Sequence, residues 1–339
     1  MKPTATRLVQ SLLLVAGLFA ASIFALSQGA FSIQWSGILD NQTSHHAVFW
    51  SIRLPRALLT ILVGASLGVC GAAMQGLFRN PLADPSLIGI SSGAALGASA
   101  TIVFAQHLRT IIELPEAISL SLTPLMAFLV GLLVTLVLYQ LSSQKGKTNI
   151  AILLLAGVAI QAITGAGIGL LTYLADNNEL RDLTFWSMGS FNAANWTAVK
   201  ITSLCVVPSL LLLLTQSKAL NAFMIGEQNA FYLGIRVERT KRIIIILTAL
   251  TIGIVVSVSG IIGFIGLVVP HLIRLLVGAN HNFLLPFSAL FGAILLLLAD
   301  TLARTVIAPA ELPIGIITAL IGGPFFLYLL IKQRRQLLL

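Results

Sequence analysis

The stretch RNPLADPSLIGISSGAALGA, residues 79–98, places charged residues, prolines and small polar residues between two long apolar runs of this sequence. Pro81 and Pro85 exclude a continuous helix there, because each proline removes a backbone donor and disfavours helix at the preceding residue. Asp84 can cap a helix that restarts at Pro85, and small polar residues continue through 91–93. Irregular backbone among membrane segments is tolerated where it is buried in protein or lines a water-filled cavity. The stretch therefore indicates a gate or the wall of a cavity, with a structural turn at the membrane surface as the alternative.

Two arginines in RLPR, Arg53 and Arg56, bracket a proline at the predicted start of a helix. Cations are unfavourable beside the positive end of a helix dipole, so local helix stability does not explain them. They either anchor the membrane interface by extending their charges into water or offer charge to an acidic partner, and the residues alone favour neither. Asp300 and Arg304 lie four residues apart and predict an ion pair at a helix end.

No set of residues predicts catalysis. The Gly-Lys-Thr of residues 146–148 resembles the end of a phosphate-binding loop, but the glycine that such a loop needs five residues earlier is Leu141. The sequence offers no nucleophile with a base and no cluster of metal ligands. Cys70 and Cys205 lie in apolar runs and are expected to pack as small side chains. We therefore expect no catalytic residue, no metal, no cofactor and no ATP hydrolysis in this chain.

The segments that must position these residues follow from hydropathy. The chain has 339 residues, a mean hydropathy of +0.98 and only 9% charged residues, which is typical of a polytopic membrane protein. The apolar runs are long enough for helices and too long for the strands of a membrane barrel. We predict an all-α protein with a single transmembrane domain, residues 1–339, and about ten spans near residues 8–29, 54–78, 88–105, 118–141, 149–174, 195–215, 242–261, 268–278, 284–303 and 314–331. The eighth is too short to cross alone.

An even number of crossings puts both termini on one side of the membrane. Taking that side as the cytoplasm places most of the 20 basic residues there, as the positive-inside rule expects. The first apolar run, about residues 8–26, is longer than the core of a signal peptide, so we expect an uncleaved first span.

The segment QSKALNAFMIGEQNAFYLGIRVERTKR, residues 216–242, is too polar to span the membrane and too regularly patterned for a disordered loop. Apolar residues such as Phe223 and Phe231 recur along it. It is either an interfacial helix or a short helical element that docks a cytosolic protein.

Together these segments resemble the permeases of the bacterial importers for ferric siderophores, haem and vitamin B12, which are large-fold (type II) ABC importers. The resemblance covers about residues 50–331 and rests on ordered motifs: RLPR, GAAMQGLFRNPLADPSLIGISSGAALG, LLLAGVAI, LRDLTFWSMGS, GFIGLVVPHLIRLL, LLLLADTLAR and AELPIGIITALIGGPFFLYLL. It implies about ten helices per subunit, a homodimer with the pathway on its two-fold axis, two cytosolic ATPase subunits that bind the ATP, and a periplasmic binding protein. The chain would lie in the bacterial inner membrane with both termini in the cytoplasm and with no nucleic-acid partner.

The resemblance also implies roles for individual residues. Arg53, Arg56 and Arg304 match positions where external arginines meet glutamates of the binding protein, which favours docking as the role of RLPR. Within residues 216–242, the coupling segment, the positions that rest on the ATPase match Gly226, Glu227, Ala230, Phe231, Leu233 and Gly234. The inner gate and the pathway beside it match Asn80, Leu82, Ser91 and Ser92, and a second gate position at the start of the fifth helix matches Ile150 and Ala151. The vitamin B12 relatives carry small hydroxylated residues at that second position, so this departure argues against vitamin B12 as the cargo.

The motifs of residues 79–98 and 165–190 look most like those of haem permeases. The resemblance therefore implies ATP-driven import of haem or a ferric siderophore, with vitamin B12 import by the same mechanism as an alternative. A secondary transporter driven by an ion gradient is an alternative of a different class. Such transporters usually keep ionisable residues near the middle of the membrane, and only Arg274 and Asp300, both near helix ends, come close to that here.

Overall fold

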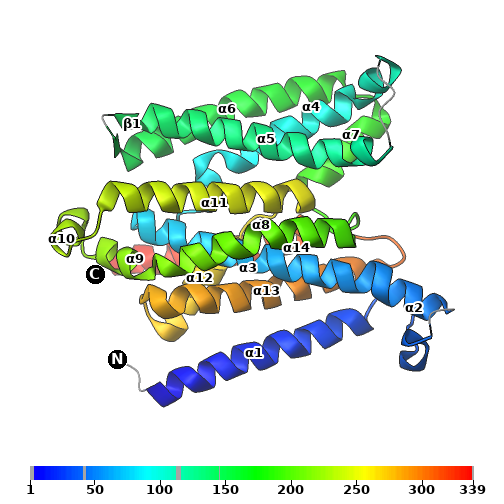
Figure 1. Cartoon of the computed structure of the whole chain (residues 1–339), viewed down its shortest axis with the longest axis horizontal. Helices are drawn as coiled ribbons and strands as arrows, with labels where there is room; N and C mark the ends of the chain where they lie inside the picture. Colours follow the sequence, from blue (N-terminus) through cyan, green and yellow to red (C-terminus); the bar gives the residue numbers. More distant parts are fainter. Residues whose placement is uncertain (1–3, 41–42, 112–115, 145, 338–339) are drawn as a thin grey trace.

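The apolar runs fold as helices because a backbone in a bilayer must satisfy its hydrogen bonds within its own segment. In the computed structural model, which describes residues 4–40, 43–111, 116–144 and 146–337, these helices lie side by side with their axes roughly aligned (Figure 1). The bundle is made of α1 (Thr4–Ser27), α3 (Leu54–Phe78), α4 (Ile90–Ile111), α5 (Glu116–Ser142), α6 (Ile150–Leu174), α8 (Trp196–Thr215), α11 (Val237–Ser259), α12 (Ile265–Val277), α13 (His281–Thr305) and α14 (Ile314–Leu337).

Short elements connect these helices at the two ends of the bundle. They are the 3-10 helix η1 (Trp35–Ile38), α2 (Ser44–Val48), the π-helix η2 (Phe49–Arg53), the 3-10 helix η3 (Pro85–Ile88), the strands β1 (Ser143–Gln144) and β2 (Lys147–Thr148), and the helices α7 (Asn177–Ser187), α9 (Ser217–Met224) and α10 (Glu227–Tyr232). The two strands pair antiparallel, with Ser143 opposite Thr148 and Gln144 opposite Lys147, directly before α6.

The membrane-spanning helices agree with the predicted spans. Among the described residues, 7 helices are long and apolar enough to cross a membrane, and three shorter apolar helices accompany them: Ile90–Phe104, Ile265–Val277 and Ile314–Tyr328. α12 has 13 residues, which is about 20 Å of helix. Because the hydrocarbon core is about 30 Å thick, α12 cannot cross alone, as expected for the eighth run. The prediction of about ten apolar helices is confirmed.

α3 is largely buried in the centre of the bundle, and glycines let neighbouring backbones approach it closely. A Cβ added to Gly71 would lie 1.9 Å from the carbonyl oxygen of Gly266 in α12, and one added to Gly64 would lie 2.4 Å from that of Gly292 in α13. Such close contacts associate membrane helices where lipid supplies no hydrophobic driving force. Gly165 in α6 differs, because a Cβ there would meet no described atom within 4 Å.

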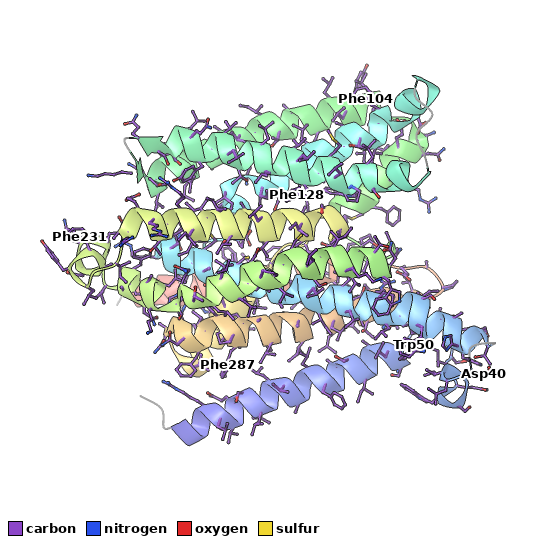
Figure 2. The ribbon with its side chains drawn as sticks, viewed as in Figure 1. Asp40, Trp50, Phe104, Phe128, Phe231 and Phe287 are labelled. Carbon is purple, nitrogen blue, oxygen red and sulfur yellow. The ribbon has the colours of Figure 1, made fainter. Side chains whose placement is uncertain are left out.

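The two ends of the bundle carry different elements (Figure 1). α1 begins and α14 ends at one end, where α9, α10 and the start of α6 also lie; we call it the α10 end. The opposite end carries α2, η2 and α7, and we call it the α2 end. Figure 2 shows Phe231 at the α10 end and Trp50 at the α2 end. α1 therefore begins and α14 ends on one side of the bundle, as an even number of crossings requires, and the number of crossings itself stays a prediction.

Candidate functional site

An ion-pair network lies at the α2 end, centred on Arg56 in the first turn of α3. Its Nε and Nη2 donate to the carboxylate of Asp300 in α13, with a shortest distance of 2.8 Å, and its Nη1 donates to Glu311 at 2.9 Å. The Asn192 side-chain oxygen accepts a further bond from Nη1 at 3.2 Å. Arg304 Nε lies 3.7 Å from Asp300 Oδ2, which confirms the predicted ion pair between these two residues.

Arg53 and Arg304 hold the end of α1. The backbone carbonyls that accept from Arg53 are those of Leu26 at 2.7 Å, Ser27 at 3.0 Å and Phe31, and those that accept from Arg304 are Gln28 at 2.8 Å and Ala25. The last carbonyls of a helix have no partner inside the helix, and the negative end of its dipole favours a cation. The two arginines therefore cap α1 from neighbouring segments.

Arg53 and Arg56 are buried and Arg304 is half-buried, so the expectation of free external charges is wrong. Arg53 is 5% exposed and Arg56 is 9% exposed, because their charges are bound by carboxylates and carbonyls of the same chain. Glu311 and Asn192, which complete this network, were missed in the sequence, since they lie 255 and 136 residues beyond Arg56. Docking of a binding protein at this end stays a prediction.

The polar stretch at residues 79–98 forms the interrupted helix that its prolines predict. α3 ends before Arg79, which adopts the left-handed backbone with a φ of 52°. The Asp84 side chain accepts the N–H of Ser86 at 2.8 Å and caps η3, and α4 then begins at Ile90. The helix end, the turn, the Asp84 cap and the restart are all confirmed.

The predicted gate residues in this stretch differ in exposure. Asn80 is exposed, and its side-chain oxygen accepts the N–H of Leu82 at 2.9 Å, while Leu82 is half-buried. Ser91 is buried, and the hydroxyl of Ser92 donates to the Gly89 carbonyl at 3.0 Å. Asn80 and Leu82 are thus open to a neighbouring molecule, whereas the pathway role of the two serines stays a prediction.

The second predicted gate position lies at the start of α6, also at the α10 end. The side chain of Asn149 caps this helix by accepting the N–H of Ala151 at 2.9 Å. Ile150 is half-buried and Ala151 is exposed. α6 also packs against η3, because a Cβ added to Gly157 would lie 2.6 Å from the Leu87 carbonyl oxygen. The two predicted gate segments therefore belong to neighbouring elements.

The coupling segment folds as α9, α10 and the first turns of α11, and it does not span the bundle, as predicted. Gly226 and Gly234 flank α10 with φ values of 109° and 82°, a backbone that other residues rarely adopt. Ala230 is fully buried and holds α10 to the bundle. Phe231 and Leu233 are 68% and 63% exposed, so the segment presents an apolar surface at the α10 end (Figure 2).

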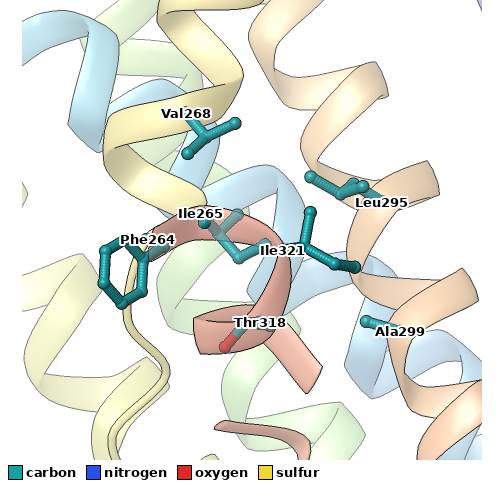
Figure 3. A pocket seen from close by; sticks show the side chains of 8 residues that line it. Phe264, Ile265, Val268, Leu295, Ala299, Thr318 and Ile321 are labelled. Atoms are coloured by element: carbon teal, nitrogen blue, oxygen red, sulfur yellow. The ribbon is translucent and has the colours of Figure 1, made fainter. Parts of the chain in front are cut away.

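A small apolar cavity lies between α12, α13 and α14 (Figure 3). Phe264, Leu295 and Ile321 are among its lining residues, and its volume is about 10 Å³. This is room for about one water molecule, whereas pockets for organic ligands measure about 300–1,000 Å³. The cavity is therefore not a cargo site.

These features define the class of protein as a polytopic membrane permease. No group of His, Cys, Asp and Glu side chains among the described residues could hold a metal ion. The long apolar helices of the described residues are those of a protein that spans a membrane several times. The chain belongs to the FecCD transport family, which residues 14–332 match.

The relatives agree with this assignment. The chain is 47% identical over 325 residues to the hemin transport system permease protein HmuU of Yersinia pestis, covering 96% of this chain and 94% of that one. It is 40% identical over 327 residues to the vitamin B12 import system permease protein BtuC of Serratia proteamaculans, covering 95% and 92%. A solved metal-chelate type ABC transporter in an inward-facing conformation superposes with a TM-score of 0.82 at 33% identity, covering 94% of this chain and 97% of that one. The predicted family, the large-fold importer permease and a transport role are confirmed.

Proposed function

We propose that this chain is the permease of an ATP-driven importer that carries haem or a ferric siderophore across the bacterial inner membrane. The observation that carries the proposal is the 47% identity to a hemin permease along 96% of the chain. Vitamin B12 is the alternative cargo, because a vitamin B12 permease is 40% identical over a similar length. Ile150 and Ala151, in place of small hydroxylated residues, favour haem or a siderophore.

The cargo path is proposed to run between two copies of the chain. The cavity among α12, α13 and α14 is far too small for such a cargo, about 10 Å³. α6 exposes an apolar face on which Leu155 is 72% and Ile163 is 70% exposed. On this helix a Cβ added to Gly165 or Gly169 would meet no described atom within 4 Å, so a second copy can approach closely.

We further propose that the α10 end faces the cytoplasm, together with both termini. Support comes from the basic residues Lys147, Lys218 and Arg236, which lie in elements of this end. Phe231 and Tyr232, 68% and 83% exposed, then face the cytosol, and an exposed apolar patch of this kind is typical of a protein interaction site. The proposed occupant is the ATPase subunit, one for each copy of the permease.

The gate is proposed at the same end, between the turn that holds Asn80 and Leu82 and the start of α6 with Ile150 and Ala151. The contact between η3 and α6 supports a joint role for these two segments. At the α2 end, the binding protein is proposed to dock on a surface whose shape the buried arginines fix, rather than on free arginine charges.

Transport by the purified permease in lipid vesicles tests this function. Import of haem that requires ATP, the cognate ATPase and the binding protein is the expected result. Import driven by an ion gradient, with this chain alone in the vesicle, would overturn it. Competition among haem, a ferric siderophore and cobalamin for the cognate binding protein then identifies the cargo.

A further inference from the structure

A buried cation lies at the α10 end, in the second turn of α11. Lys241 is 3% exposed, and its Nζ donates to Glu227 Oε2 at 2.7 Å, to Glu238 Oε1 at 3.2 Å and to the carbonyl oxygen of Thr148 at 3.4 Å. Lysine is almost never buried to this degree unless it is paired. Its three acceptors belong to three elements, α10, α11 and β2, so one ammonium group joins all of them.

Glu238 completes this cluster. Its second oxygen, Oε2, accepts the N–H of Thr148 at 2.8 Å, so side chains of α11 bind both backbone groups of Thr148. Thr148 is 5% exposed and directly precedes Asn149, the N-cap of α6. The cluster therefore ends two residues before the predicted gate residue Ile150.

α10, on the other side of the cluster, is a short helix that packs against the bundle through Ala230. It is 6 residues long, and Gly226 and Gly234 flank it with positive φ values. A Cβ added to Gly234 would meet no described atom within 4 Å. Glu227 is the first residue of this helix, and the exposed Phe231 lies one turn further on. A displacement of the exposed apolar surface therefore also moves the carboxylate that binds Lys241.

We propose that Lys241 is a positioning residue that links α10 to the start of α6. When the ATPase displaces α10, Glu227 draws the ammonium of Lys241 away from the Thr148 carbonyl, which leaves Thr148 bound to α11 through Glu238 alone and loosens the first turn of α6. The contact to Thr148 is the longest of the three, 3.4 Å against 2.7 Å to Glu227, so it is the first to be lost. The flexible four-carbon stem of lysine allows this movement without a shift of α11. The inference rests on the proposed function, because that function places the ATPase on α10.

If Lys241 only stabilised the start of α6, the cluster would not require Glu227. Glu238, three residues before Lys241 on the same helix, already pairs with the lysine and binds Thr148. Glu227 adds only the connection to α10, and its side chain is 36% exposed. Its carboxylate therefore stays partly hydrated and can follow α10 without being stranded as an unpaired charge in a dry interior.

The test measures the accessibility of the start of α6, at the proposed gate, rather than the stability of the fold. The Cys205→Ser background removes the exposed native cysteine, and Ala151→Cys then reports the start of α6 through its rate of labelling by a maleimide. In vesicles that hold this permease with its cognate ATPase, ATP should change the labelling rate by about fivefold or more, which is the lower end of typical coupling between sites. Lys241→Met should reduce this change to less than about twofold while the ATPase stays bound, and Glu227→Gln should do the same at an ATPase concentration that saturates the variant. Lys147→Met is the matched control, because it removes an exposed cation directly beside Thr148 and should keep the full response to ATP.

Glu227→Gln decides the question if Lys241→Met does not fold, since this side chain is partly exposed and glutamine has the same shape. A full response to ATP in the folded variants would overturn the link, and so would an equal loss in Lys147→Met. Release of the ATPase by Lys241→Met would also overturn it, because this lysine would then act in docking rather than in the link to α6. If the permease that carries only Cys205→Ser and Ala151→Cys binds no ATPase, the proposed function is refuted, and this inference with it.

Discussion

Replacing Arg56 with methionine tests whether the arginines of the α2 end stabilise the fold or bind a partner protein. Methionine keeps an apolar stem but removes the guanidinium, so the Asp300 side chain, 2% exposed, loses its closest cation. Breaking a buried ion pair by removing one partner costs about 3–5 kcal/mol. Arg304 still lies 3.7 Å from Asp300, and Glu311 is 32% exposed and can be hydrated. We therefore expect the lower limit, about 3 kcal/mol.

Thermal unfolding of the permease in detergent measures this loss. A change of 1 kcal/mol shifts Tm by about 2–4 °C in domains of 150–250 residues and by less in a longer chain, so Arg56→Met should lower Tm by about 5 °C. Arg181→Met is the matched control, because Arg181 is exposed at the same end, lies over the Phe185 ring at 5.6 Å, and forms no ion pair within the part of the chain that the structure describes. This control should shift Tm by no more than about 1 °C.

The double variant Arg56→Met/Asp300→Leu separates the ion pair from the volume of the side chains. Replacing both partners of a buried pair by apolar residues is often neutral, so this variant should recover most of the lost stability. The affinity of the periplasmic binding protein for each variant provides the second measurement. If the Arg56→Met permease has an unchanged Tm and no longer binds this protein, Arg56 acts in docking and does not stabilise the fold.

Three further predictions concern the bundle, the apolar surface and the gate turn. Gly71→Ala would place a Cβ 1.9 Å from the Gly266 carbonyl oxygen, so it should destabilise the bundle by about 1–3 kcal/mol or more, measured as Tm in detergent. Gly165→Ala, where nothing lies within 4 Å, should leave the Tm of the single chain unchanged. Phe231→Asp should abolish co-purification of the ATPase without lowering Tm, since this side chain is 68% exposed; a retained complex would remove the coupling assignment. Asp84→Ala should lower stability by about 1 kcal/mol because η3 loses its cap, and Asp84→Asn should restore it.

The helices and the gate turn were predictable because each depends on a local pattern. A run of apolar residues determines a membrane helix whatever surrounds it, and a short run determines a helix such as α12 that does not cross. The Asp84 cap needs only the residue two positions ahead, Ser86. These interactions form between neighbours in the chain, so the sequence contains both partners side by side.

The environment of the arginines was not predictable in the same way. Arg56 meets Asp300 and Glu311, which lie 244 and 255 residues further along the chain. An arginine at a helix start has the same local pattern whether it faces water or a buried carboxylate. Only the packing of α13 against α3 decides between the two, and that packing is a property of the whole bundle.

The burial of Lys241 was equally hard to predict from the sequence. This lysine lies in RVERTKR, a charged run that on its own indicates a solvated helix start, yet it is 3% exposed. The Gly-Lys-Thr that resembles the end of a phosphate-binding loop lies in the hairpin of β1 and β2. Side chains of α11 bind both backbone groups of its last residue, Thr148. Spatial proximity, rather than residue type, gives both segments their proposed role.

The packing of α3 determines where movement can occur. This helix begins at the Arg56 network and ends at the turn that holds Asn80, so it joins the two ends of the bundle. Its backbone lies against Gly266 and Gly292 at distances that leave no room for a methyl group, so it cannot slide past α12 or α13 without separating from them. In the proposed function, opening of the gate therefore involves elements outside this core, namely α6 with its exposed face and α10 with its flanking glycines. In the proposed function, we therefore expect displacement of α10 by the ATPase to reach the start of α6 without deforming the core, which the Arg56 network holds at the α2 end.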